Sequence, residues 1–209
     1  MQVTGIILSG GKSSRFRGQG DKALLPLTEE PIIQWIIDKL SPLFKEILVV
    51  TNKLEDYKFL LTRGSGKKVK LVSDIYPGKA ALSGLHSGLF HSKSLYNFVI
   101  ACDLPFIRTE IVQYLLTQSK RYDVVIPWLK TGQEPFCAVY SKNCLKPITG
   151  LIKKNAKPKI INFFSRIRLR KIAENEIKKI DPDLISFFNL NTPRDYQKAQ
   201  KLAKKFLAA

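Results

Sequence analysis

The sequence has few cysteines, few acidic residues and no long apolar run, and each shortage excludes a class of protein. Its three cysteines, Cys102, Cys137 and Cys144, are too few and too scattered for a disulfide framework or a zinc site. No stretch approaches the roughly 20 apolar residues that a membrane span needs. The first eight residues lack the basic region and the cleavage pattern of a signal peptide. We therefore expect a cytoplasmic protein with free thiols and no membrane association.

Basic residues outnumber acidic ones by about two to one. The 209 residues include 35 Lys and Arg against 17 Asp and Glu, a formal net charge of +18. From Leu151 to the end there are 15 basic and 5 acidic residues, so +10 of that charge lies in the last 59 positions. Such an excess attracts anions, whether nucleic acid, anionic lipid or a phosphorylated small molecule. A solvated, Lys-rich surface without a specific ligand is the simpler alternative.

Apolar runs alternate with helical patterns along the first 127 residues. Apolar residues make up 44% of the chain, and its length is sufficient for one α/β domain with a real core. Buried strands are predicted at Val3–Leu8, Ile47–Thr51, Val69–Val72, Phe98–Ala101 and Val124–Ile126. Helices are predicted between them at Ile32–Leu40, Glu55–Thr62, Leu82–Phe90 and Glu110–Ser119. This alternation predicts a mainly parallel sheet covered on both faces.

The regular alternation of strand and helix patterns ends after Pro127. The predicted elements there are a strand at Phe136–Tyr140, a short helix at Pro158–Ser165 and a basic strand or hairpin arm at Arg166–Ile172. A final helix is predicted from Pro193 to Phe206, with Thr192 as its N-cap. No internal repeat or low-complexity linker interrupts the chain.

A glycine-rich run follows the first predicted strand directly. Gly10 and Gly11 allow a tight turn that brings backbone N–H groups against an anion, and Arg15 and Lys22 add positive charge. A Walker A motif would need its first glycine at Ile6, inside the strand, so that interpretation fails. Glycines at the Rossmann spacing occur only about ten residues beyond the strand, so that match is weak. A glycine-rich turn without a ligand is the remaining alternative.

The whole segment from Leu8 to Leu27 resembles the signature loop of the molybdenum cofactor guanylyltransferases, which are nucleotidyltransferases. Their pattern is Leu-Ala-Gly-Gly-x-x-x-Arg-Met-Gly-x-Asp-Lys-x-Leu-Leu. Here Leu-Ser-Gly-Gly opens the segment and Asp21-Lys22-Ala-Leu-Leu ends it. Two departures are visible: Phe16 replaces the methionine, and the spacer Arg17–Gly20 is two residues longer.

Three further segments resemble the same family, in the same order. Asp103 ends a predicted strand in Cys-Asp-Leu-Pro-Phe-Ile, which is similar to the metal-binding stretch of the family. Asp74 lies in a segment similar to the one beside the nucleoside, although Ala80 and Ala81 replace its Gly-Pro. Asn189 and Asn191, two apart on an extended segment, resemble the Asn-Val-Asn-Thr-Pro element at the acceptor side. The run from Glu134 to Tyr140 also looks like the strand that enters the acceptor region.

The resemblance implies a Rossmann-like three-layer nucleotidyltransferase fold with a mostly parallel central sheet, in one domain over residues 1–209. Residues 1–127 would form the nucleotide-binding half and residues 128–209 the acceptor-binding half. A chain of this kind would transfer GMP from GTP to the terminal phosphate of molybdopterin and release pyrophosphate. Its substrates would be GTP and molybdopterin. A monomer is expected, with transient cofactor-delivery proteins as partners and no stable nucleic acid.

The resemblance also implies a role for each motif residue. The groups that would hold the phosphates are Arg15, Lys22 and the backbone amides of Leu8, Ser9, Gly10 and Gly11. Asp103 would bind Mg²⁺ and, with Arg15 and Lys22, complete the catalytic set. Asp74 would support the nucleoside, and Asn189 and Asn191 would contact the acceptor. Basic residues that would attract the acidic acceptor are Lys157, Lys159, Arg166, Arg168 and Arg170.

Two other functions stay open at this point. One is a related transferase that uses CTP, or whose acceptor is a sugar or alditol phosphate. Gly10-Gly11 favours guanine, because cytidylyltransferases tend to carry Ala-Ala-Gly there. The other, from a different class, is a nucleic-acid-binding protein, which the charge allows. The sequence carries no RNP motif, helix-turn-helix signature or basic stretch interleaved with aromatic residues.

Overall fold

The computed structural model describes residues 2–10, 20–62, 68–78, 80–154 and 159–208. Within these residues eight strands form one sheet, in the order β3-β2-β1-β4-β7-β5-β6, and β8 pairs with β5. The strands are β1 (Val3–Leu8), β2 (Glu46–Val50), β3 (Lys68–Val72), β4 (Tyr96–Ala101), β5 (Val124–Leu129), β6 (Gly132–Gln133), β7 (Cys137–Ser141) and β8 (Leu169–Ala173).

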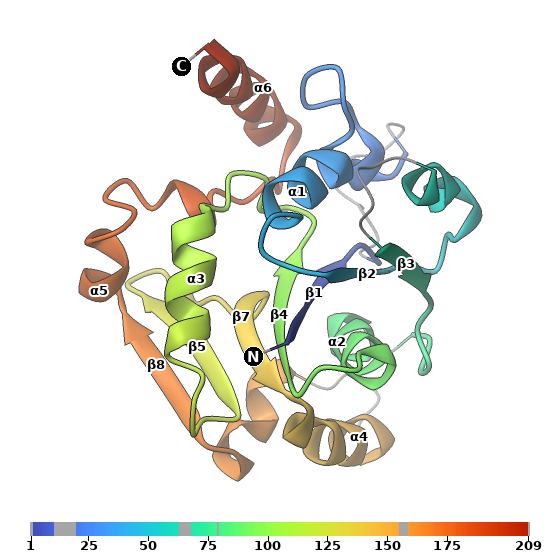
Figure 1. The fold of residues 1–209 in the computed structure, drawn as a ribbon, viewed down its shortest axis with the longest axis vertical. Coiled ribbons are helices and arrows are strands. Elements are labelled where there is room, and N and C mark those ends of the chain that lie inside the picture. The colour runs from blue at the N-terminus through green and yellow to red at the C-terminus, as the bar shows by residue number, and fades with distance from the viewer. Residues whose placement is uncertain (1, 11–19, 63–67, 79, 155–158, 209) are drawn as a thin grey trace.

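Helices cover this sheet on both sides (Figure 1). The α-helices are α1 (Ile32–Leu40), α2 (Ala80–His91), α3 (Thr109–Thr117), α4 (Leu145–Lys154), α5 (Glu174–Lys178) and α6 (Pro193–Ala208). Short 3-10 helices are η1 (Lys22–Leu24), η2 (Glu55–Leu61), η3 (Lys142–Cys144), η4 (Ile160–Arg166) and η5 (Ile185–Phe187).

The buried side chains form two cores, one on each face of the sheet. Successive strand residues point to opposite faces, so Ile7 lies in one core while Ile6 and Leu8 lie in the other. The Ile7 core is closed by apolar residues of α1, α3 and α6, and the opposite core by those of α2 and α4. The predicted three-layer fold is confirmed.

The first half of the sheet follows the predicted alternation. β1 pairs in parallel with β2 and β4, and β2 pairs in parallel with β3. Helix α1 covers the predicted range because its apolar residues recur at three-and-four spacing and bury one face. The segment predicted as a helix at Glu55–Thr62 is a 3-10 helix, η2.

The second half of the chain completes the same sheet. β7 lies between β4 and β5 and runs antiparallel to both, and β8 pairs in parallel with β5. The basic strand therefore begins at Leu169, three residues later than predicted. Helix α4 is absent from the prediction, because Pro147 and Gly150 interrupt its helical pattern.

The N-terminus of α6 has the cap that the sequence predicts. The Thr192 hydroxyl accepts a hydrogen bond from the Asp195 backbone N–H at 3.2 Å, and the Asp195 carboxylate accepts one from the Thr192 N–H at 2.9 Å. This reciprocal pair satisfies two backbone donors that a helix start leaves without intrahelical partners. All three cysteines are free. In the described ranges, no helix is long and apolar enough to cross a membrane.

Gly88 lets α2 approach β1 closely, and replacing it is expected to destabilise the protein. A Cβ atom at Gly88 would lie 2.5 Å from Ile6 Cγ2, inside a packed core. Such overpacking costs about 1–3 kcal/mol, so urea unfolding of Gly88→Ala should show a lower free energy of unfolding.

The matched control for this substitution is Gly150→Ala in α4. An added Cβ there meets no described atom within 4 Å. Alanine is favoured over glycine in a helix by about 1 kcal/mol, so Gly150→Ala should be neutral or stabilising. Equal effects of the two substitutions would contradict the close approach of α2 to β1.

Candidate active site

The carboxyl ends of the four parallel strands lie in register at one edge of the sheet. Leu8, the last residue of β1, pairs with Val50 of β2 and with Ala101 of β4. Val50 in turn pairs with Val72, the last residue of β3. The residues that follow these strands therefore begin at a common edge, which is where ligands bind in open α/β sheets. Ser9, Asn52, Asp74 and Asp103 each follow one of these strands within two residues and so lie at this edge.

Lys22 and Asp103 form an ion pair at this edge. Lys22 Nζ donates to Asp103 Oδ2 at 3.0 Å, although the two residues are 81 positions apart. The side chains are 13% and 23% exposed, respectively, so a ligand can reach both. The structure thus brings Lys22, from the end of the glycine-rich run, into contact with Asp103, which follows β4.

The segment between the two predicted acceptor residues also contacts this pair. Leu190 donates its backbone N–H to the Asp103 carbonyl at 2.9 Å and accepts from Lys22 Nζ at 2.7 Å. Leu190 is buried, whereas Asn189 and Asn191 on either side are exposed. The two asparagines therefore flank the Lys22–Asp103 pair, with their side chains toward solvent.

Asp74 is held by Asn52. Asn52 Nδ2 donates to Asp74 Oδ2, and the Asp74 backbone N–H donates to Asn52 Oδ1, each at 3.0 Å. Burial raises the pKa of Asp74, and the Asn52 hydrogen bond opposes this shift. A Cβ added at Gly84 of α2 would lie 3.7 Å from Asp74 Oδ1, so α2 packs closely against this carboxylate.

Glu134 is a carboxylate near the candidate site to which no motif assigned a role. It lies in the turn before β7, and two residues later the Phe136 carbonyl accepts from the Ala101 N–H at 2.8 Å, next to Asp103. Burial raises the pKa of Glu134, and the negative charge of Asp103 raises it further. The turn that carries Glu134 is therefore next to the end of β4, which Asp103 follows. The sequence did not indicate this position of Glu134, because residues 134–140 resemble a strand.

Some predicted residues lie outside the part of the chain that the structure describes. These are Gly11 and Arg15, together with the rest of the run from 11 to 19. On its two sides, Leu8 and Ser9 are buried and Gly10 and Gly20 are exposed. Gly20 has φ +77°, a backbone conformation that suits glycine and lets the chain turn into η1.

The side chains at the edge suit a metal that is held jointly with a ligand. Mg²⁺ prefers oxygen ligands and usually takes one or two carboxylates together with substrate phosphates. Among the described residues, no group of three or more His, Cys, Asp and Glu side chains could hold a metal ion alone. Asp103 therefore fits a magnesium–phosphate complex better than a metal site made by protein alone.

These observations agree with the comparison with known proteins. A family described as the MobA-like NTP transferase domain matches residues 5–170. The chain belongs to this family. The match includes Lys22, Asp74, Asp103 and Glu134, and it ends before the segment that carries Leu190. This MobA-like chain is thus a nucleotidyltransferase.

Individual relatives extend the similarity over nearly the whole MobA-like chain. A molybdenum cofactor guanylyltransferase of Desulfosudis oleivorans is 34% identical over 203 residues, 97% of this chain and 96% of the relative. A probable molybdenum cofactor guanylyltransferase of Clostridium perfringens is 35% identical over 199 residues, 94% and 96% of the two chains. Molybdopterin-guanine dinucleotide biosynthesis protein A of Archaeoglobus fulgidus has a similar structure, with a TM-score of 0.81, 25% identity and coverage of 97% and 99%.

Arg168 does not lie where the sequence suggested, among the residues that would attract the acceptor. Its guanidinium donates to both carboxylate oxygens of Asp123, each at 3.1 Å. Asp123 precedes β5, whose first residue Val124 lies at the amino ends of the parallel strands. Arg168 is therefore at the opposite edge from Asp103, and its assignment to the acceptor is wrong. Arg170 pairs with Glu176, and Lys157 lies outside the described residues.

Replacing Arg168 with alanine is expected to make the protein more sensitive to acid. The Arg168 hydrogen bonds hold the pKa of Asp123 at about 2. A lowered carboxyl pKa stabilises the fold above the unfolded value of about 3.9, and this contribution is lost as pH falls through about 2. Arg168→Ala should raise the Asp123 pKa, so the acid-unfolding midpoint should move to higher pH.

The control for this substitution is Lys120→Ala, which removes one exposed positive charge. Circular dichroism during acid titration measures the midpoint, which should stay in place for the control. Transfer activity at neutral pH should be unchanged in Arg168→Ala. A weaker affinity for the acceptor in that variant would instead place Arg168 at the site.

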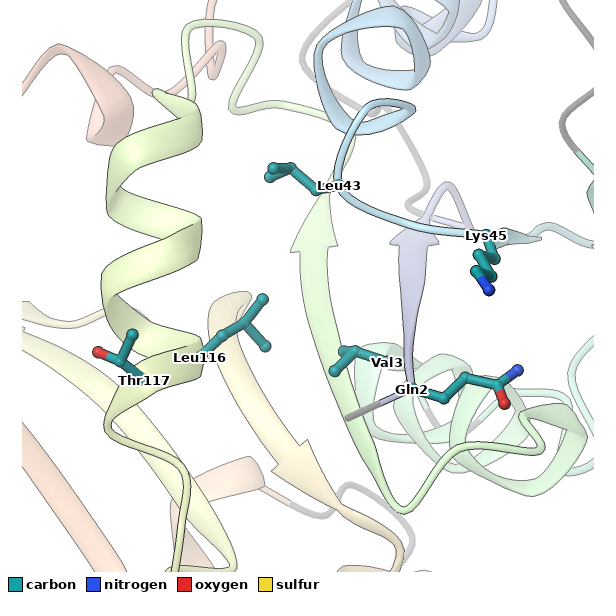
Figure 2. Close-up of a pocket in the computed structure, with 6 residues that line it drawn as sticks. All are labelled: Gln2, Val3, Leu43, Lys45, Leu116 and Thr117. Carbon is teal, nitrogen blue, oxygen red and sulfur yellow. The ribbon is translucent and has the colours of Figure 1, made fainter.

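A hollow lies at the amino ends of the strands, away from the candidate site (Figure 2). Its volume is about 550 Å³, and it is lined by Gln2, Val3, Leu43, Lys45, Leu116 and Thr117. Gln2 and Val3 stand at the start of β1, whereas the site begins after its last residue. No residue of the hollow belongs to the motifs that the sequence analysis singled out.

Proposed function

We propose that this protein transfers GMP from GTP to the terminal phosphate of molybdopterin and releases pyrophosphate. The ion pair of Lys22 and Asp103, at the edge where the parallel strands end, carries the proposal. Two groups of opposite charge there match what a nucleotide–metal complex needs, namely a cation for phosphate oxygens and a carboxylate for a metal. The names of the relatives support guanine and molybdopterin as the substrate classes.

The chemistry requires two anions to be brought together. The acceptor phosphate already carries negative charge, so little proton transfer is needed before it attacks the α-phosphorus. The protein must hold both reactants in line and neutralise the charge that develops, which are positioning and electrostatic tasks. Lys22 suits this role because its ammonium lies within a partly buried edge, where charge interactions are stronger than in water.

The glycine-rich segment would hold the triphosphate. The backbone amides of Gly10 and Gly11 would donate to phosphate oxygens, together with Arg15 and Lys22. Leu8 belongs to β1 and the Ser9 N–H already donates to the Val50 carbonyl, so these two predicted residues would shape the turn instead of donating to phosphate. Lys22 would exchange its present partner, Asp103, for phosphate when the nucleotide binds. Asp74, fixed by Asn52, would support the nucleoside.

Asp103 would hold Mg²⁺ after Lys22 has turned to the phosphates. The bound ion would neutralise phosphate charge and help to orient the pyrophosphate leaving group. Asn189 and Asn191 would contact the acceptor from the exposed side of the Leu190 segment. We infer a monomeric, cytoplasmic enzyme to which other proteins deliver the molybdenum cofactor transiently.

Pyrophosphate release tests the proposal. The protein is incubated with Mg²⁺, molybdopterin and each of the four nucleoside triphosphates in turn. We expect rapid release with GTP, dependent on both molybdopterin and the metal. Faster release with CTP would assign a cytidylyl transfer instead. No release, combined with salt-sensitive binding to a short DNA duplex at moderate salt, would favour a nucleic-acid-binding protein.

A further inference from the structure

Tyr57 places a polar group inside the core directly beneath the candidate site. Its side chain is fully buried in the core that α1 covers, and it comes from η2, the 3-10 helix after β2. A phenylalanine would fill the same apolar space. A buried hydroxyl is costly unless it is hydrogen-bonded, so the contacts of this hydroxyl indicate what it does.

One contact of the Tyr57 hydroxyl is Ser9, the first residue after β1. Tyr57 Oη and Ser9 Oγ are 2.5 Å apart, both are buried, and they are 48 positions apart. The Ser9 backbone N–H also donates to the Val50 carbonyl at 2.8 Å. Ser9 is therefore held through its backbone by β2 and through its side chain by Tyr57, immediately before Gly10.

Asp21, the residue before Lys22, adds negative charge that acts on this hydroxyl. Burial raises the pKa of Tyr57, the Ser9 hydrogen bond opposes this shift, and the charge of Asp21 raises the pKa further. The Asp21 carboxylate, 9% exposed, also accepts from the Ala23 backbone N–H at 3.2 Å and lies 3.4 Å from Lys53 Nζ. Asp21 thereby fixes the start of η1, which carries Lys22.

The hydrogen bond between Ser9 and Tyr57 is buried, and either hydroxyl can be its donor. A buried hydrogen bond is electrostatically stronger than one in water, so the Ser9 side chain is held firmly in one position.

We propose that Tyr57 is a positioning residue for the nucleotide site, holding the Ser9 side chain so that the Gly10 backbone N–H is fixed where the phosphates bind. This inference rests on the proposed function. Tyr57 does not touch the substrate; it acts through Ser9, the residue after β1. Loss of its hydroxyl keeps the core filled and releases the Ser9 side chain.

The test is the affinity for GTP with Mg²⁺, measured by calorimetry on Tyr57→Phe and on the wild-type protein. Losing one hydrogen bond of this kind should weaken GTP binding roughly 5- to 10-fold. The control is Tyr114→Phe, which removes a phenol that donates to the Glu176 carboxylate at 3.0 Å, away from the site. That control should leave GTP affinity unchanged.

A purely structural role of Tyr57 predicts a different pattern. It would lower the Tm of Tyr57→Phe and leave the GTP affinity of the folded protein at the wild-type value, which would overturn the inference. A double-mutant cycle adds a second readout. In a Ser9→Ala background, the effect of Tyr57→Phe on affinity should shrink, because Tyr57 acts through Ser9; an undiminished effect would contradict that route.

The wild-type protein separates this inference from the proposed function. Wild-type pyrophosphate release with GTP, combined with equal GTP affinities of wild type and Tyr57→Phe, would overturn only the role of Tyr57. If the wild type binds another triphosphate better, the same comparison is made with that nucleotide, and the function alone is revised. Binding of none of the four triphosphates would overturn both.

Discussion

Replacing Asp103 with alanine is expected to abolish nucleotidyl transfer while the protein stays folded. The carboxylate is the proposed magnesium ligand, and metal stabilisation of transition-state charge contributes several kcal/mol. Losing about 4 kcal/mol of it would lower the rate roughly 10³-fold. The backbone hydrogen bond from Leu190 to the Asp103 carbonyl does not involve the side chain and should persist. Pyrophosphate release at saturating GTP measures the loss.

Asp183→Ala is the control for this variant, because it removes an exposed carboxylate that has no place in the site. Its turnover should equal that of the wild type, and both variants should keep the wild-type circular dichroism spectrum. Asp103→Asn retains the shape of the side chain without its charge, and should be as inactive as the alanine variant. Normal turnover of Asp103→Ala that still requires metal would refute the role of Asp103.

Replacing Lys22 with alanine is expected to weaken the binding of GTP severely. Lys22 brings a charged donor to the site, and a hydrogen bond with a charged group contributes about 1.5–3 kcal/mol. This loss corresponds to a rise in the dissociation constant of roughly 10- to 150-fold. Calorimetry with GTP and Mg²⁺ measures it. The pyrophosphate assay should show the same loss in kcat/KM.

Lys45→Ala is the matched control for Lys22→Ala. It removes an equal charge from the exposed surface at the other edge of the sheet, beside the hollow of Figure 2. If net charge alone attracted GTP, both variants would bind it equally weakly. If only Lys22→Ala loses affinity for GTP, the effect belongs to the site. Wild-type affinity in Lys22→Ala would contradict the proposed binding of the phosphates by Lys22.

The sequence predicts the strands and the edge of the sheet at which the site lies. Each strand is a short apolar run, and the residues that follow parallel strands share one edge. Asp74 and Asp103 could therefore be placed together without coordinates. Lys22 could be assigned to the same edge through the motif it ends, and the 3.0 Å contact with Asp103 agrees with that assignment.

Contacts between distant segments could not be predicted from the sequence. The carbonyl of Leu190 binds Lys22 across 168 positions, but every residue has a carbonyl, so no residue type signals this contact. In the sequence, Tyr57 cannot be distinguished from any other aromatic residue of the core. Only the fold shows that its hydroxyl reaches Ser9. Glu134 acquires its position because β7 inserts between β4 and β5, a pairing that no local pattern specifies.

The basic excess illustrates the same limit for charge. The count of Lys and Arg indicates attraction to anions in general and does not distinguish a ligand-binding arginine from a paired one. Asp123 lies 45 positions from Arg168, and the strand pairing of β5 with β8 brings them together. Arg168 therefore supports the structure at the amino ends of the strands.

The most direct test of the proposed site is a crystal structure with GTP and Mn²⁺ in place of Mg²⁺, recorded at the manganese absorption edge. We expect an anomalous peak beside the Asp103 carboxylate, with the triphosphate within hydrogen-bonding reach of Lys22 Nζ. Nucleotide and metal bound elsewhere, with the Lys22–Asp103 ion pair still closed, would contradict the account.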